Sequence, residues 1–270
     1  MPTLYIVATP IGNLEDISFR ALRILSDVAL IAAEDTRKTR ILLAAYGIRT
    51  PLTSYHEHNK WAKLSYLLSR LESEDVALVS EAGMPGISDP GYELVVAARE
   101  RGISIVPIPG PSVLVTALAV SGLPANEFIY LGFLPRRRGE RRRFLEQVAD
   151  EGRTMVAFEA PHRLISTLED ILDVLGDRGI AVCRELTKIH EEVFRGAVSA
   201  AIARFREPIG EFTLVIEGKP KGERALTAAV EGELRRLHEH GFSAKEAISQ
   251  VAKATGVPKR ELYRLWIRLS

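Results

Sequence analysis

Three short segments combine glycine and proline with small polar residues, and each directly follows an apolar run. They are Thr9–Asn13, Ser80–Gly91 and Pro107–Ser112. In open α/β sheets, ligands bind beyond the carboxyl ends of the strands. Glycine lets the backbone approach a ligand closely and offer it N–H groups. These loops therefore predict a ligand-binding edge of a sheet. Because the chain has neither a G-x-G-x-x-G nor a G-x-x-x-x-G-K-[ST] motif, a Rossmann dinucleotide site and a P-loop are both disfavoured.

The segment Glu34–Arg37 offers groups for proton transfer and anion binding. Asp35 fits two interpretations. It can be the N-cap of a helix, with Arg37 in solvent, or it can accept or orient a proton while Arg37 binds phosphate.

A second polar cluster, His56–Asn59, precedes a helical pattern. Paired imidazoles are common metal ligands. No third and fourth ligand follow at a suitable spacing, so we predict no metal site. The cluster is then either a solvated loop or a substrate contact in which His56 or His58 acts as a base.

Two groups of charged residues follow later strands of the chain, Glu159 to Arg163 and Arg184 to Lys188. Ion pairs that close a cleft would explain them.

A cluster of six arginines within eight residues comprises Arg136–Arg138 and Arg141–Arg143. Such a run is often a solvated helix start. Positive charge at a helix N-terminus opposes the helix dipole, however, and favours an anionic partner.

The composition is that of an ordinary globular protein. The 270 residues are 46% hydrophobic, 7% aromatic and 26% charged, with a net charge of +1, so a global basic field is excluded. The single cysteine, Cys183, rules out an internal disulfide framework and fits a reducing, cytoplasmic location.

The N-terminus lacks the pattern of a secretory signal. The uncharged stretch 103–126 is long enough to span a bilayer, but its prolines predict a strand, a loop and a helix.

The elements that must position these residues alternate between short β-branched runs and amphipathic stretches, which predicts an α/β fold with a largely parallel sheet. Predicted strands are Leu4–Ala8, Val28–Ala33, Val76–Val79, Ile103–Ile108, Phe128–Leu131, Met155–Glu159, Ile180–Arg184 and Thr213–Glu217. Predicted helices are Ile17–Leu25, Arg37–Tyr46, Lys60–Leu71, Tyr92–Arg101, Val113–Ser121, Arg141–Ala149, Leu164–Leu175 and Ala197–Phe205.

A polar Gly/Pro linker, Gly218–Gly222, separates these elements from an all-helical tail. The tail helices are expected at Leu226–His240, Ser243–Thr255 and Lys259–Leu269, with a Ser243/Glu246 capping box. The last two have the layout of a helix-turn-helix. Val257, Leu262, Leu265 and Trp266 should face a small core, while Lys259, Arg260, Arg264 and Arg268 point outward. The tail either binds nucleic acid or is a helical cap that packs or dimerises.

Several long strings resemble the ribosomal small subunit methyltransferase I family, which has the tetrapyrrole-methylase fold. They are Leu4–Leu14, Ala32–Arg37, Ser54–Asn59, Ser80–Gly91, Pro107–Ser112 and Glu159–Leu164. The resemblance runs in order from residue 3 to about 218 and extends to the tail. It implies two α/β subdomains, 1–122 and 123–218, with a cofactor cleft between them, and a helical domain at 223–270.

The activity implied by the resemblance is S-adenosylmethionine-dependent methylation. The acceptor would be the ribose 2′-hydroxyl of a cytidine in the decoding region of 16S ribosomal RNA, within the small ribosomal subunit. The resemblance also implies a homodimer, and no membrane association is expected. Two other functions remain open: methylation of a tetrapyrrole or another small molecule on the same fold, and a non-catalytic nucleic-acid-binding regulator.

The resemblance also assigns candidate site residues. The catalytic candidates are Asp35, His56, His58, Glu185 and Lys188. The candidates for cofactor binding are Pro10, Gly12, Glu81, Gly83, Met84, Pro85, Pro109, Gly110, Ser112, Val113, Phe158, Arg184, Phe212 and Thr213. The candidates for substrate binding are Arg37, Asn59, Arg136, Arg137, Arg138 and Arg163. Glu81 and Met84 depart from the expected Ser-Asp-Ala-Gly-Thr-Pro string, because Glu81 extends the carboxylate by one methylene and Met84 lacks a hydroxyl.

Overall fold

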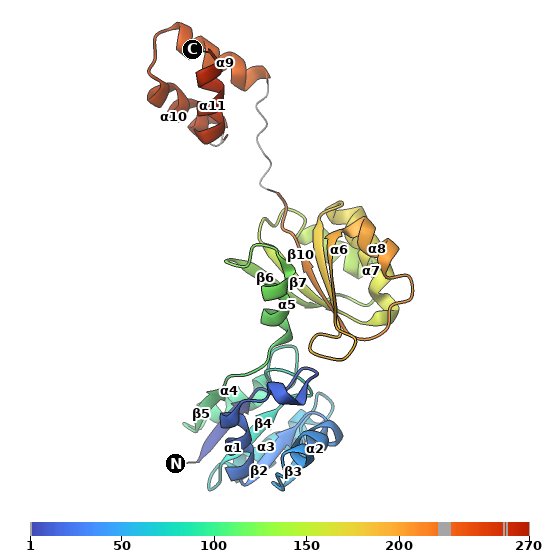
Figure 1. The fold of residues 1–270 in the computed structure, drawn as a ribbon. Helices are drawn as coiled ribbons and strands as arrows, with labels where there is room; N and C mark the ends of the chain where they lie inside the picture. The colour runs from blue at the N-terminus through green and yellow to red at the C-terminus, as the bar shows by residue number, and fades with distance from the viewer. Residues whose placement is uncertain (1, 221–227, 256, 258, 270) are drawn as a thin grey trace. The chain divides into compact units, whose positions relative to one another are not determined.

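The computed structural model describes residues 2–220, 228–255, 257 and 259–269. The chain divides into two compact units (Figure 1). One comprises Met1–Ala149 with Arg153–Glu217, and the other Asp150–Gly152 with Gly218–Ser270. The expected start of the first tail helix at Leu226, the end of the predicted linker and residues 256 and 258 lie outside the described residues.

The first sheet is fully parallel, in the order β3-β2-β4-β1-β5. Its strands are β1 (Thr3–Val7), β2 (Leu30–Ala33), β3 (Leu52–Ser54), β4 (Val76–Val79) and β5 (Ser104–Ile108). The helices between them are α1 (Phe19–Asp27), α2 (Thr36–Ala45), α3 (Lys60–Arg70) and α4 (Tyr92–Glu100), with a 3₁₀ turn at Leu14–Asp16.

Both faces of this sheet are buried, because neighbouring residues of a strand point to opposite sides. Val7 of β1 packs in one apolar cluster with residues of α1 and α2. Ile6 packs in another with residues of α3 and α4. The strands are consequently short apolar runs without polar alternation, as expected for a parallel sheet.

The second sheet is mixed, in the order β6-β7-β10-β8-β9, and only the β6–β7 pair is parallel. Its strands are β6 (Phe128–Phe133), β7 (Thr154–Glu159), β8 (Gly179–Arg184), β9 (Glu192–Ala197) and β10 (Phe212–Ile216). The remaining helices of this unit are α5 (Val113–Ser121), α6 (Arg138–Gln147), α7 (Leu164–Leu175) and α8 (Val198–Arg204), with a 3₁₀ turn at Pro161–Arg163.

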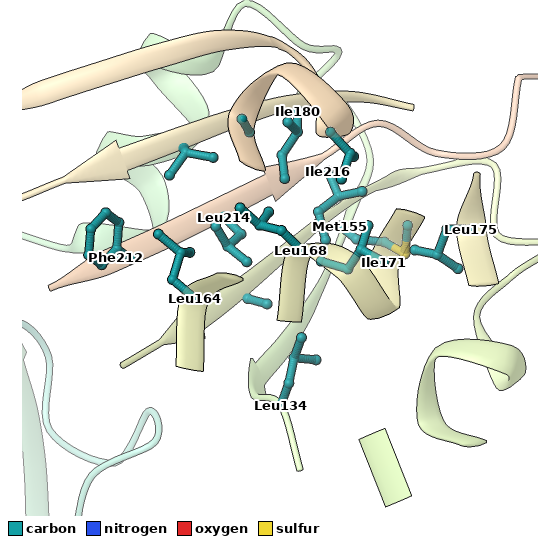
Figure 2. Close-up of a cluster of buried hydrophobic side chains, with 14 of the residues drawn as sticks. Leu134, Met155, Leu164, Leu168, Ile171, Leu175, Ile180, Phe212, Leu214 and Ile216 are labelled. Atoms are coloured by element: carbon teal, nitrogen blue, oxygen red, sulfur yellow. The ribbon is translucent and has the colours of Figure 1, made fainter. Parts of the chain in front are cut away.

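The core of the second sheet lies beneath α6, α7 and α8. Figure 2 shows Leu164, Leu168 and Ile171 of α7 packed against Met155 and Leu214 of the strands. The opposite face of the sheet is covered by α5, the helix that follows the last strand of the first sheet. This helix places the loop after β5 next to the second sheet.

The tail forms a three-helix unit with its own core. Its helices are α9 (Ala228–Glu239), α10 (Ala244–Thr255) and α11 (Lys259–Leu269). The predicted core residues Val257, Leu262, Leu265 and Trp266 are buried, and the predicted outward cations are exposed. The capping box is confirmed, since the Ser243 hydroxyl and amide both bond the Glu246 carboxylate.

Two expectations from the sequence are corrected. The strands β3 and β9 were not predicted, and the second sheet is mostly antiparallel.

The uncharged stretch 103–126 is a strand, a loop and a helix, as predicted. Within the described part of the chain, every helix is too short or too polar to span a bilayer.

Candidate functional site

A cavity of about 380 Å³ lies between the carboxyl ends of the first sheet's strands and the second sheet, and we call it the main cavity. Its lining comes from the loops after β2, β4 and β5 and from β6, β7 and β10. A second cavity of about 230 Å³, the side cavity, adjoins it and shares the residues Ile11, Glu81, Ala82 and Glu211. The main cavity has the size of an ordinary small-molecule site.

The loops after β1 and β4 are joined by an antiparallel bridge. The amide of Thr9 donates to the carbonyl of Gly83, and the amide of Gly83 donates to the carbonyl of Thr9, both at 2.9 Å. Gly83 has a φ of +80°, a backbone conformation that residues other than glycine rarely adopt. The glycine therefore fixes the backbone that lines the main cavity.

The loop after β1 also contacts a turn of the second sheet. The amide of Asn13 donates to the hydroxyl of Thr187 at 3.1 Å. A Cβ on Gly12 would lie 2.5 Å from Cγ of Lys188, so only glycine permits this approach. Glu185 and Thr187 both have positive φ, at +50° and +67°. The turn is thus held in a conformation that L-residues disfavour.

The opposite wall of the main cavity carries aromatic rings. Phe158 of β7 makes edge contacts with Phe133 and Tyr130 of β6, with ring centroids 5.5 and 5.2 Å apart. The hydroxyls of Tyr130 and Ser88 are hydrogen-bonded at 2.5 Å and connect the loop after β4 to the second sheet. The site can therefore hold an apolar ring on one side and polar groups on the other.

Most of the predicted cofactor-binding residues lie at these cavities. Those that line the main cavity are Glu81, Gly83, Met84, Ser112, Val113, Phe158, Phe212 and Thr213. Pro10, Gly12 and Glu81 line the side cavity. Pro85, Pro109, Gly110 and Arg184 line neither. The side chain of Arg184 instead donates to the carbonyl of Ile209 at 2.7 Å.

Asp35 is the N-cap of α2. Its carboxylate accepts the amide of Arg37 at 2.8 Å and the Arg37 guanidinium at 2.9 Å. The hydrogen bonds from the Arg37 side chain and backbone lower the pKa of Asp35 to about 2. Such a carboxylate is a weak proton acceptor at neutral pH. The geometry therefore supports the capping interpretation of Asp35, and the Arg37 side chain remains largely exposed.

His56 and His58 lie beside each other, with ring centroids 6.0 Å apart, but line neither cavity. Asn59 accepts the amide of His56 at 2.8 Å and donates to the Ser54 hydroxyl at 2.9 Å, so its side chain holds this loop. Nδ1 of His56 is buried and has no partner among the described residues. Within the same residues, no group of three or more His, Cys, Asp or Glu side chains could hold a metal ion.

Glu185 and Lys188 form one ionic network with Glu211. The Lys188 ammonium lies 3.0 Å from Glu185 and 2.9 Å from Glu211. Burial alone would raise the pKa of Glu185, but the Glu211 amide and Lys188 hold it below its usual value. Burial likewise opposes the charge on Lys188, yet its two carboxylate partners raise its pKa. Lys188 therefore stays protonated at the side cavity.

Three of the clustered arginines converge on one buried carboxylate, that of Asp170 in α7. Asp170 lies 3.0 Å from Arg138, 2.7 Å from Arg141 and 3.2 Å from Arg142. The side chains of Asp170 and Arg141 are 0% and 3% exposed. These arginines hold α6 on α7, while Arg136, Arg137 and Arg143 are exposed.

The predicted substrate residue Arg163 is likewise engaged within the protein. Its guanidinium pairs with the buried carboxylate of Glu159 and donates to the carbonyl of Leu134 at 3.2 Å. Only 13% of its side chain is exposed.

Several residues of the main cavity were missed by the sequence interpretation. They include Glu34, Ser88, Asp89, Leu114 and Phe133. Burial is the main cause that raises the pKa of Asp89, to about 7, with Glu34 and Glu81 adding to it and a hydrogen bond from Ser80 opposing it. Asp89 belongs to the quoted loop Ser80–Gly91, so its position after a strand was the available signal.

A parallel sheet with glycine-rich loops, joined to a second mixed sheet across a cavity, is the arrangement of the tetrapyrrole methylases. The family model described as Tetrapyrrole (Corrin/Porphyrin) Methylases matches residues 3–202, and one described as RsmI C-terminal HTH domain matches residues 224–270. Solved structures support the fold. A cobalt precorrin-4 methyltransferase has a TM-score of 0.59 at 18% identity, covering 79% of this chain and 94% of its own. The uroporphyrin-III-C-methyltransferase from Thermus thermophilus has a TM-score of 0.56 at 22% sequence identity, and the match covers 81% of this chain and 95% of that one.

Curated relatives are more similar still. The ribosomal RNA small subunit methyltransferase I of Halalkalibacterium halodurans is 50% identical over 98% of this chain and 94% of its own length. That of Thermotoga maritima is 52% identical over 81% of this chain and 100% of its own. The chain therefore belongs to the ribosomal RNA small subunit methyltransferase I family.

Proposed function

We propose that this chain transfers a methyl group from S-adenosylmethionine to the ribose 2′-hydroxyl of a cytidine in the decoding region of 16S ribosomal RNA. The observation that carries the proposal is the main cavity, which lies beyond the carboxyl ends of the first sheet's strands in a member of this family. The alternative, a small-molecule methyltransferase on the same fold, has less support because the curated relatives are named for ribosomal RNA.

The residues present fit such a methyl donor. Ser112 is the N-cap of α5 but forms no capping hydrogen bond with its side chain, so its hydroxyl can meet a ligand. The N-terminus of α5 favours a carboxylate, since the helix dipole places partial positive charge there. Ile11 and Phe158 supply apolar contact. When bound, the donor would supply an electrophilic methyl group on a sulfonium.

In-line methyl transfer requires that acceptor and donor be positioned before reaction. The bridge between Thr9 and Gly83 fixes the two loops that would hold the donor. The bond from Ser88 to Tyr130 holds the loop after β4 against the aromatic wall. We infer that these contacts exclude water and leave one open side for the RNA.

The decisive test is methylation of isolated small ribosomal subunits that lack the modification. Incubation with the protein and S-adenosylmethionine should create a ribose-methylated cytidine in the decoding region of 16S RNA, which ribose-methylation-sensitive sequencing would map. Methylation of naked 16S RNA in parallel would show whether the assembled subunit is the substrate. The absence of a new methylated ribose in either RNA would overturn the proposal.

We infer that the exposed arginines of the cluster contact RNA phosphate. Arg136 and Arg143 are exposed and form no ion pair among the described residues. Replacing both by alanine should weaken RNA binding and flatten the dependence of log affinity on log salt by up to about one unit per lost contact. The single-turnover rate at saturating RNA should stay unchanged. Filter binding at several salt concentrations would measure the slope.

Arg99 and Arg101 provide the matched control for that variant, because both are exposed arginines at the far end of α4. Their replacement by alanine should leave the salt slope unchanged. If the two double variants show the same dependence of log affinity on log salt, the cluster does not bind the RNA.

The outward cations of α11 make the tail a second candidate RNA surface. Deletion of the tail should weaken RNA binding less than loss of the arginine cluster does.

The expected homodimer and cytoplasmic location stay predictions. Analytical ultracentrifugation of the full chain would settle the oligomeric state.

A further inference from the structure

The helix α11, the last helix of the tail in Figure 1, has one buried side and one exposed side. Its buried side includes Leu262, Leu265 and Trp266, which pack in the core of the tail and are at most 8% exposed. Residues three and four positions apart lie on the same side of a helix. The exposed residues follow this spacing, and we call them the α11 face: Lys259, Arg260, Tyr263, Arg264, Ile267 and Arg268.

The charge of the α11 face is entirely positive. Four of its six residues are cations, and the single acid of the helix, Glu261, is half-buried. Among the described residues, none of these four cations forms an ion pair. Arg236 of α9, by contrast, pairs with Glu233 at 2.9 Å. The α11 face can therefore bind an anionic partner without first breaking an ion pair of the protein.

An aromatic ring lies in the middle of this positive face. Tyr263 is 53% exposed, and Ile267, one turn further along the helix, is 58% exposed. Within the described part of the chain, the Tyr263 ring contacts no other aromatic ring. Arg260 and Arg264 flank it in the sequence. Proteins that bind single-stranded nucleic acid combine these two features, because cations follow the backbone while bases stack on exposed aromatic rings.

The centre of the α11 face suits the flat side of a base better than its edge. A helix-turn-helix reads duplex DNA by placing its second helix in the major groove, where side chains form hydrogen bonds to base edges. Ile267 cannot form such a bond, and Tyr263 offers one hydroxyl. The major groove of duplex RNA is too deep and narrow for side chains to read, whereas unpaired RNA bases are free to stack on aromatic rings. The face therefore fits unpaired nucleotides better than a duplex.

We propose that the α11 face binds an unpaired segment of RNA, with one base stacked on Tyr263 and the neighbouring phosphates held by Arg260 and Arg264. The inference rests on the proposed function for the identity of this RNA, which is ribosomal. The α11 face shares no residue with the main cavity or the side cavity. It therefore contributes to the affinity for RNA and not to the rate of methyl transfer.

The first test measures the affinity of the full chain for a short, fluorescently labelled single-stranded RNA by anisotropy. The parent protein carries Arg136→Ala and Arg143→Ala, so that the arginine cluster does not hold the probe. In this parent, Tyr263→Ala should weaken binding about 5- to 100-fold, the loss expected for one stacked base. Tyr263→Phe keeps the ring and should bind like the parent.

Tyr66 of α3 provides the matched control. It is also an exposed tyrosine, at 39%, and Lys63 and Arg70 lie near its ring. Arg70, however, is paired with Glu74. Tyr66→Ala should therefore leave the affinity for the probe unchanged. The proposal fails if Tyr263→Ala binds like the parent, or if Tyr66→Ala weakens binding as much as Tyr263→Ala does.

The second test detects stacking directly. A 2-aminopurine base in the same RNA loses fluorescence when it stacks on an aromatic ring. At saturating protein, its fluorescence should fall with the parent and with Tyr263→Phe, but should stay high with Tyr263→Ala. Circular dichroism checks that each variant is folded. Quenching that persists in a folded Tyr263→Ala variant would overturn the proposal.

The third test separates stacking from phosphate contacts through the salt dependence of binding. Arg264→Ala should flatten the dependence of log affinity on log salt by up to about 0.7 unit, the value for one phosphate of a single strand. Tyr263→Ala should lower the affinity without changing this slope. Arg236→Ala removes a tail arginine that is paired with Glu233, and should leave the slope unchanged. A slope that Arg264→Ala does not alter would contradict the proposed phosphate contact.

Competition tests which class of nucleic acid the α11 face prefers. Unlabelled single-stranded RNA should displace the probe at lower concentrations than duplex RNA or duplex DNA of the same sequence. Equal or stronger competition by either duplex would overturn the proposal. If the wild type methylates no ribosomal RNA, the proposed function fails. If it does, and Tyr263→Ala changes neither affinity nor quenching, only the inference about the α11 face fails.

Discussion

Gly110→Val should abolish measurable binding of S-adenosylmethionine, a loss of at least about 100-fold, or about 2.7 kcal/mol. Gly110 lies in the loop between β5 and α5, and a Cβ there would lie 3.0 Å from Cβ of Ala8 at the end of β1. A branched side chain must push the loop away from β1. Because this loop positions Ser112 and the N-terminus of α5 at the main cavity, the wall of the cavity would move. Isothermal titration calorimetry measures the effect.

Gly110→Ala and Gly232→Val are informative controls. A single methyl group at position 110 meets Ala8 but can be accommodated by a shift of a few tenths of an ångström, so a smaller loss is expected. Gly232, in α9, has open space around it, and valine there should leave cofactor affinity unchanged. Wild-type affinity in Gly110→Val would mean that this loop does not shape the binding site.

Asp170→Ala should destabilise the protein by about 3–5 kcal/mol, as is typical when one partner of a buried ion pair is removed. The substitution leaves the Arg141 guanidinium buried, with Ser166 at 3.4 Å as a remaining contact. It also releases Arg138 from α7, while Arg142 keeps its ion pair with Asp173 of the same helix. Urea unfolding of the full chain, followed by circular dichroism, measures the change in the free energy of unfolding.

Asp173→Ala is the matched control, because Asp173 is half exposed and pairs only with Arg142. Its loss should cost about 1 kcal/mol or less. The pH dependence gives a further check. Burial opposes the charge on Asp170, but Arg138 and Arg141 lower its pKa below 3.8. Its stabilisation is therefore present at neutral pH and is lost as pH falls through that lowered pKa. Similar losses for both variants would contradict the buried role of Asp170.

The sequence predicted the parallel sheet and its helices well, because both faces of that sheet are buried and its strands are continuous apolar runs. It did not predict β3, which has three residues at a sheet edge, or β9, an edge strand with charged residues and Gly196. An edge strand needs only one paired side, so its sequence carries less apolar signal. Strand direction in the second sheet also depends on tertiary pairing that periodicity does not encode.

The site was predictable as a set of loops, but the state of each charged residue was not. Arg138 and Arg141 belong to a basic run in the sequence, yet their partner Asp170 lies about thirty residues further along the chain. Asp89 was part of a recognised loop. Its raised pKa comes from burial and from the nearby Glu34 and Glu81, and these depend on the folded arrangement.

Three residues with side chains, Ser88, Glu185 and Thr187, keep positive φ angles around the cavities. Each such conformation costs roughly 1–3 kcal/mol, which the two well-packed cores must offset. Glycine at these positions would relieve the strain but would leave the backbone freer. The side chains therefore preorganise the loops, which are already ordered when a ligand arrives, so that binding loses little conformational entropy. A variant with glycine at these three positions would be more resistant to heat, but its empty site would be less rigid.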